Sequence, residues 1–130
     1  MKIINIEEVH GFKIGDWASY DGFKIQTDEK EVMLLISDSQ GCCESWGHIT
    51  SADDIKDFIG AEIIKIEEVD TAYNKKVIDA TSELDSGGAV FLNVETDKGL
   101  LQFAVYNAHN GYYGHGVLVK YNEVEKETDV

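Results

Sequence analysis

Hydrophobic and polar residues alternate along much of the chain, and this period of two predicts β-strands. The alternation is clearest in residues 90–95 and 101–105, which flank the turn sequence Asp97-Lys-Gly99. A second turn sequence, Asn110-Gly111, precedes the alternating residues 117–121. Asn-Gly favours a hairpin because both turn positions need positive φ. We therefore predict that these three segments form an antiparallel meander.

Two segments depart from this alternation. Residues 32–36 are continuously apolar, as expected of a central strand that is covered on both faces. Residues 52–59 space their apolar side chains as on a helix, after the capping residue Ser51 and before Gly60, which is suited to end a helix. Residues 73–80 fit neither pattern clearly. The predicted fold class is α+β: a strongly curved, mainly antiparallel sheet with one short helix at about residues 52–59.

The length of 130 residues, without repeats or linkers, indicates one domain. We assign residues 1–122 to a single α+β domain and expect the charged residues 123–130 to form a flexible tail. The first residues turn acidic where a signal peptide would be apolar, and no apolar run approaches the ~18 residues of a membrane span. We therefore expect a soluble protein in the cytoplasm.

The chain carries a formal net charge of -14, and its 11 basic residues are all lysine. An acidic surface without arginine repels phosphate backbones, which argues against direct binding of nucleic acid. The charge suits a basic partner, such as a protein surface that normally holds nucleic acid, although plain solubility explains it equally well. The residues expected to contact such a partner are acidic or aromatic: Glu7, Glu8, Asp28, Glu29, Glu31, Asp53, Asp54, Tyr112 and Tyr113.

Residues 38–48 gather both cysteines, two carboxylates and one of the four histidines. Thiolate, imidazole and carboxylate are the ligands that zinc takes in proteins. The candidate zinc ligands are Asp38, Cys42, Cys43, His48 and, from the hairpin at the second turn, His115 or His109. Buried structural cysteines are the main alternative, and a reactive thiol is another. The spacing matches no standard zinc signature, so the residues alone leave these readings open.

Residues 109–116 form the second unusual run, in which two tyrosines and three glycines would make a binding loop. The alternative is a glycine-rich hairpin whose tyrosines cover the edge of a sheet. His10 lies next to the acidic pair Glu7-Glu8 and is interpreted as a surface histidine.

Three blocks together resemble a family of small uncharacterised phage and prophage domains: Gln40-Gly-Cys-Cys-Glu-Ser45, residues 55–68 and Asn110-Gly-Tyr-Tyr-Gly114. The resemblance covers residues 32–121. Members of that family often carry histidine at the position of Asp38 and aspartate at the position of Gly41, and the first exchange preserves a metal ligand. The resemblance implies a phage-encoded accessory protein, and small acidic proteins of this kind include anti-CRISPR proteins that bind Cas nucleases.

Our leading hypothesis is therefore a phage-encoded inhibitor of bacterial defence, an anti-CRISPR protein that binds a Cas9-type nuclease through its acidic surface. It would block the loading of nucleic acid without catalysis, with zinc in a structural role. The alternative is a protein that binds a small molecule or a metal, such as a sponge for a defence signal. That protein would use the Cys-Cys segment and the Gly-Tyr-Tyr loop. An enzyme is not expected.

Overall fold

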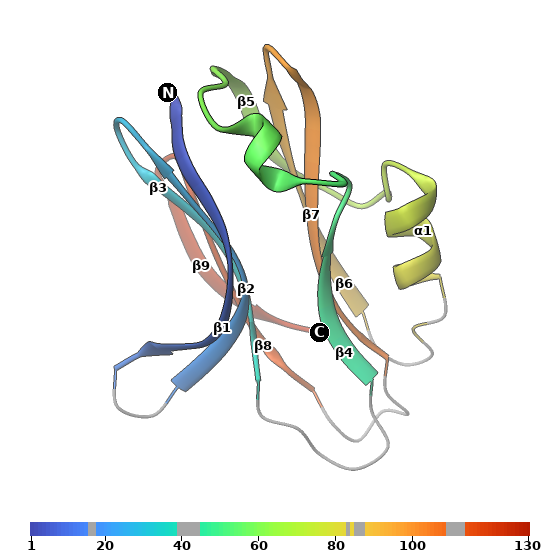
Figure 1. Ribbon diagram of the computed structural model, residues 1–130. Coiled ribbons are helices and arrows are strands. Elements are labelled where there is room, and N and C mark those ends of the chain that lie inside the picture. Colours follow the sequence, from blue (N-terminus) through green and yellow to red (C-terminus); the bar gives the residue numbers. More distant parts are fainter. Residues whose placement is uncertain (16–17, 39–44, 83, 85–87, 109–113) are drawn as a thin grey trace.

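The computed structural model describes residues 1–15, 18–38, 45–82, 84, 88–108 and 114–130, and most of these lie in strands (Figure 1). The strands are β1 (Ile3–Ile14), β2 (Ala18–Thr27), β3 (Glu31–Ser37), β4 (Ser45–Thr50), β5 (Ile63–Val69), β6 (Gly88–Thr96), β7 (Gly99–Ala108), β8 (Gly116–Tyr121) and β9 (Val124–Asp129). The helices of the described residues are a 3-10 helix, η1 (Ile55–Phe58), and an α-helix, α1 (Lys75–Thr81).

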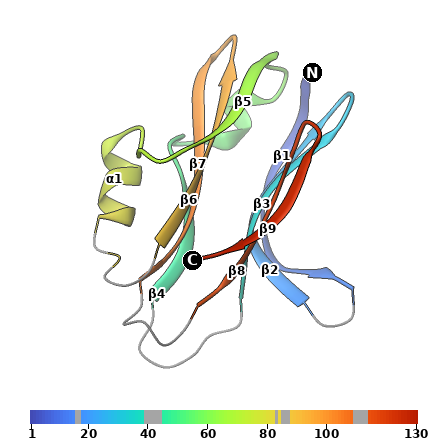
Figure 2. The same cartoon turned by 180° about the vertical axis from the view of Figure 1, so that it is seen from behind.

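In the described part of the chain, the strands divide into two antiparallel sheets. Sheet A has the order β1-β2-β3-β8-β9, and sheet B has the order β4-β7-β6-β5. The sheets face each other, and α1 lies on the outer face of sheet B (Figures 1 and 2). The predicted α+β class, with mainly antiparallel strands and one short helix, is confirmed, although the strands form two sheets instead of one. The predicted three-strand meander is wrong in its last strand, because β6 pairs with β7 whereas β8 pairs with β3 and β9 in sheet A.

The main core lies between the inner faces of the two sheets. Phe23 of β2 and Phe103 of β7 meet there, with ring centroids 4.7 Å apart. Residues 32–36 of β3 are all buried, so the central strand predicted from their continuous apolar run is confirmed. Three of them face the core, and burial of this apolar surface is the dominant attraction between the sheets. The core-facing residues of β3 and its neighbour β8 are Val32, Leu34, Ile36, Val117 and Val119.

The α-helix covers a smaller core on the outer face of sheet B. Val77 of α1 is fully buried against Phe91 of β6 and Ala104 of β7. Asn74 precedes the helix in an extended conformation, and its side chain accepts a hydrogen bond from the backbone N–H of Val77 at 3.2 Å. This cap satisfies one of the free N–H groups at the helix start. A cap and one buried face explain a helix where the sequence pattern is ambiguous.

The helix predicted at residues 52–59 is reduced to the 3-10 helix η1. Ile59 already has an extended backbone, with ψ of 130°. The cause is the start of β1, which pairs with the next residues. The N–H of Gly60 donates to the carbonyl oxygen of Ile3 at 2.8 Å, and the N–H of Ile3 donates to the carbonyl oxygen of Ala61 at 2.9 Å. Tertiary pairing therefore overrides the local helical spacing.

The prediction of a flexible tail at residues 123–130 is wrong, because most of this segment is a paired strand. β9 pairs with β8 in antiparallel register from Val124 to Asp129. Asn122, in the turn between them, has φ of 49°, a conformation that asparagine tolerates better than most residues. β9 is an edge strand with mainly exposed side chains, so its sequence lacks the apolar alternation by which a strand is recognised.

Candidate metal centre between the edge strands of the two sheets

The inner face of sheet A changes from apolar to polar along β1. Ile6 lies opposite Ile25, and Glu8 lies opposite Phe23. Directly opposite residues in an antiparallel pair share a face, so Glu8 lies on the same face as the buried Phe23. β1 is an edge strand, and the Glu8 side chain is 49% exposed.

A β-bulge in β1 positions the next polar side chain on this face. The register shifts between Val9 and Phe12, so His10 and Gly11 together oppose Asp21. Gly11 has φ of 63°, a left-handed conformation that glycine adopts without steric cost. Its N–H donates to Oδ1 of Asp21 at 2.9 Å, and Oδ2 of Asp21 lies 3.5 Å from Nδ1 of His10. Asp21 therefore orients both the bulge and the imidazole of His10.

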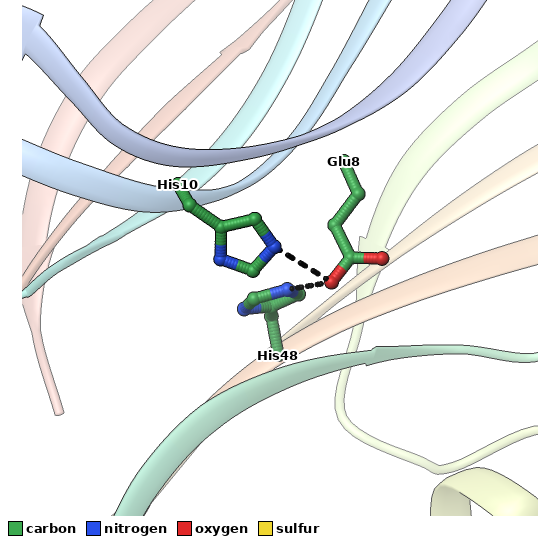
Figure 3. A group of neighbouring side chains, drawn as sticks. All are labelled: Glu8, His10 and His48. Carbon is green, nitrogen blue, oxygen red and sulfur yellow. Dashed lines mark hydrogen bonds and ion pairs between the residues drawn. The ribbon is translucent and has the colours of Figure 1, made fainter.

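His48 completes the group from β4, the edge strand of sheet B. It lies opposite Val105, its side chain is only 10% exposed, and its ring packs edge-on against Phe23 with centroids 5.1 Å apart. Nε2 of His48 lies 2.7 Å from Oε1 of Glu8 (Figure 3). Nε2 of His10 lies 3.2 Å from the same oxygen. One carboxylate oxygen is thus shared by two imidazoles that come from different sheets.

This arrangement stabilises the ionised form of Glu8. The hydrogen bond with His48 is the largest cause of a lowered Glu8 pKa, and electrostatic attraction to His48 and His10 adds to it, while partial burial opposes it. Nδ1 of His48 is buried and has no hydrogen-bond partner among the described residues. A hydrogen on Nε2 of His48 accounts for the short contact, because it donates to the carboxylate of Glu8.

Glu8, His10 and His48 lie close enough to hold a metal ion, since their ligand atoms are all within 4.8 Å of one another. Two imidazoles and one carboxylate form a ligand set that zinc takes, with a fourth position left for water. Asp21 fits the role of the outer carboxylate that orients a metal-bound histidine. A metal on Nε2 of His48 would move the hydrogen to Nδ1, where no described group accepts it. The chemistry and spacing of the three ligand groups therefore fit a metal ion.

Two ligands predicted from the sequence lie elsewhere. Asp38 is half-buried and accepts a hydrogen bond from the hydroxyl of Ser19 at 2.7 Å. His115 is buried, with Nδ1 2.6 Å from the carbonyl oxygen of Ser37 and its ring 5.1 Å from that of Trp46. Among the described residues, neither joins the group around Glu8.

Cys42, Cys43, Tyr112 and Tyr113 lie outside the described residues, together with His109. Their roles as metal ligands or binding residues stay predictions, and so does the small-molecule alternative that depends on these two segments. No pocket is found in the part of the chain that the structure describes.

The acidic residues predicted to contact a partner line the surface at several places, and all but the half-buried Glu31 are exposed: Glu7, Glu8, Asp28, Glu29, Glu31, Asp53 and Asp54. Some also have an intramolecular role. Asp54 caps η1 by accepting a hydrogen bond from the N–H of Lys56 at 2.9 Å, and Glu31 forms an ion pair with Lys24. Glu8 is directed toward the two histidines and is therefore part of the candidate metal centre.

Glu8 and His10 were not recognised as a pair from the sequence. Glu8 was assigned to the surface that contacts a partner, and His10 was interpreted as a surface histidine without a role. One signal was present: residues i and i+2 of a strand project from the same face, and Gly11 next to them marks a bulge. His48, the third member, is among the zinc ligands predicted from the sequence, but it was grouped with the cysteines instead of with Glu8 and His10. The sequence does not show that β4 lies beside β1, which is what brings His48 to this site.

A family model described as "Domain of unknown function (DUF7448)" matches residues 1–119. The chain belongs to the DUF7448 family. The matched residues run from β1 into β8 and include Glu8, His10 and His48. Membership of an uncharacterised domain family agrees with the resemblance seen in the sequence and does not bear on its origin. Comparisons with curated proteins and with solved structures found no match. Within the described ranges, this DUF7448 domain contains no helix of the length and apolarity needed to cross a membrane.

Proposed function

We propose that this DUF7448 protein is a non-catalytic binding protein that docks on a basic protein. In its specific form, the proposal is a phage-encoded anti-CRISPR protein that acts in the cytoplasm of a bacterium. It binds a Cas9-type nuclease through its acidic surface and blocks the loading of nucleic acid. Such nucleases hold nucleic acid in positively charged channels, and an acidic protein is electrostatically complementary to that surface.

The observation that supports this proposal is unbalanced negative charge, with 25 acidic residues against 11 lysines. Several lysines also lie in ion pairs, so their charge is locally offset. The pairs are Lys24–Glu31, Lys30–Glu123, Lys65–Glu67, Lys75–Asp79 and Lys126–Glu68. The carboxylates in excess give the surface a negative potential, which accelerates docking on a cationic protein and weakens with added salt.

Zinc held by Glu8, His10 and His48 would be structural in this proposal. The ligands come from β1 and β4, so a bound ion would fasten the edge of sheet A to the edge of sheet B. Two imidazoles favour zinc over magnesium or calcium, because those ions prefer oxygen ligands. The ion would also offset the negative charge of Glu8.

Capture on immobilised Cas9 that has been freed of nucleic acid tests the proposal. We expect capture at low salt that weakens as salt is raised, because the attraction between exposed charges is screened. An unrelated protein of similar size and net charge is the control, since it separates specific docking from general attraction. Absence of capture at both low and high salt would contradict the Cas9 assignment.

A further inference from the structure

The outer face of sheet A carries an apolar cluster that no helix of the described residues covers (Figures 1 and 2). Met33 and Leu35 of β3 and Leu118 of β8 are buried in it. Their half-buried neighbours are Val9, Phe12 and Tyr20. On sheet B the outer face is covered by α1. An antiparallel sheet face in contact with water is usually polar, so the partly accessible Val9, Phe12 and Tyr20 suit an interaction surface.

An acidic row borders this cluster along β9. Glu127 lies opposite Leu118, and Glu125 lies opposite Lys120. Directly opposite residues share a face, and alternate residues of one strand project from the same side. Glu125, Glu127 and Asp129 therefore all project from the outer face of sheet A, and all three are exposed.

The lysines of this face do not balance its acids. Lys24 lies opposite Glu7 and forms an ion pair with Glu31, with Nζ 3.2 Å from Oε2, so the β1 side carries two carboxylates and one lysine. At the β9 side, Glu127 and Asp129 lie opposite Leu118 and Gly116, neither of which carries charge. The face thus combines an apolar centre with a negative border.

We propose that the outer face of sheet A, here called the docking face, is the surface that binds the basic partner. Its occupant is a protein segment that combines lysine or arginine with apolar side chains. The apolar groups would pack on the half-buried Val9, Phe12 and Tyr20, and the cations would meet Glu125, Glu127 and Asp129. This inference rests on the proposed function, because it names the surface of the same binding event. A second copy of the chain is disfavoured, since it would bring like charges together.

The first arm of the test does not depend on Cas9. A short peptide of alternating lysine and leucine is titrated into 15N-labelled protein, and amide shift changes are mapped onto the strands. We expect the largest changes in β3, β8 and β9. Changes concentrated in β5, β6 or α1 would overturn the docking face.

The second arm measures binding to nucleic-acid-free Cas9 with two variants that change charge equally. Glu125→Lys with Glu127→Lys alters the docking face, whereas Asp70→Lys with Glu95→Lys alters exposed acids elsewhere. We expect the first pair to weaken binding at least about tenfold and the second by no more than about threefold. Thermal unfolding of each variant checks that it folds. A further variant, Phe12→Ser, tests the apolar cluster of the docking face.

The outcomes separate the two proposals. Equal losses in the two variants would overturn the docking face and leave the basic-partner function standing. A second outcome is that Cas9 binds neither the wild type nor any variant, while the peptide still shifts the amides of β3, β8 and β9. That result would contradict the Cas9 function and keep the docking face. A wild-type dimer in solution that Phe12→Ser disperses would show that a second copy occupies the face, which also overturns the inference.

Discussion

Oε1 of Glu8 lies 2.7 Å from Nε2 of His48, and this contact joins the edge strands of the two sheets on one side of the core. On the other side, the hydroxyl of Tyr121 and Nζ of Lys126 each lie 2.8 Å from Oε2 of Glu68 on β5. The apolar core is therefore bordered on both sides by a carboxylate that links sheet A to sheet B.

Replacement of Glu8 by Gln tests the first of these links through its pH dependence. The pKa of Glu8 is lowered, so its contribution to stability is complete above the ordinary value of 4.5 and is lost as pH falls through the lowered value. We expect Glu8→Gln to cost about 1 kcal/mol at neutral pH, because the contact is partly exposed. Urea unfolding from neutral to acidic pH measures this, with Glu7→Gln as the control. A neutral-pH stability unchanged from that of wild type would remove Glu8 as a link.

The candidate metal centre predicts about one equivalent of zinc by elemental analysis of protein purified with zinc present. The double variant His10→Ala with His48→Ala should lose it, because both imidazole ligands are absent. Cys42→Ser with Cys43→Ser is the matched comparison and should keep it. The reverse result, with zinc lost only from the cysteine variant, would move the site to the cysteine segment.

Asp21 offers a test of positioning that leaves the metal ligands themselves unchanged. Asp21→Asn weakens the charge that orients Nδ1 of His10 and the hydrogen bond from Gly11 that fixes the bulge. We expect zinc affinity to fall about 10- to 100-fold, as is typical for loss of an outer carboxylate. Competition with a fluorescent zinc chelator measures the affinity. An affinity equal to that of the wild type would show that Asp21 does not orient a ligand.

Tyr121 should ionise only well above the ordinary tyrosine pKa of 10. Burial raises its pKa to about 12, and the hydrogen bond to Glu68 adds to this effect. Because the folded value lies above the ordinary value of 10, the associated stability is complete below pH 10 and is lost as pH rises toward 12. Ultraviolet titration of tyrosinate should lose a step near pH 12 in Tyr121→Phe and keep that step in Tyr73→Phe, whose side chain is exposed. Loss of an early step in Tyr121→Phe would contradict this assignment.

The parts of the fold that the sequence predicts are those governed by local pattern. Residues 32–36, 90–95 and 101–105 are strands because their apolar spacing matches the buried faces they form. The prediction of a helix at residues 52–59 fails because Ile3 pairs with Gly60 and Ala61. This contact is distant in the sequence, so the local pattern does not show it. β9 was not predicted because the charged, exposed side chains of this edge strand give the same sequence pattern as a flexible tail.

The candidate site was only partly predictable for the same reason. Glu8 and His10 stand two residues apart, which is visible in the sequence. Asp21 reaches His10 through the β1–β2 register, and His48 reaches Glu8 through the packing of sheet B on sheet A. Neither relationship has a local signal.

The most direct test of the proposed function is the loading of guide RNA onto Cas9, followed by fluorescence anisotropy of labelled RNA. With increasing amounts of this protein added before the RNA, we expect the RNA to remain free, and the block to weaken as salt is raised. RNA that binds Cas9 equally well at every protein concentration would contradict the account.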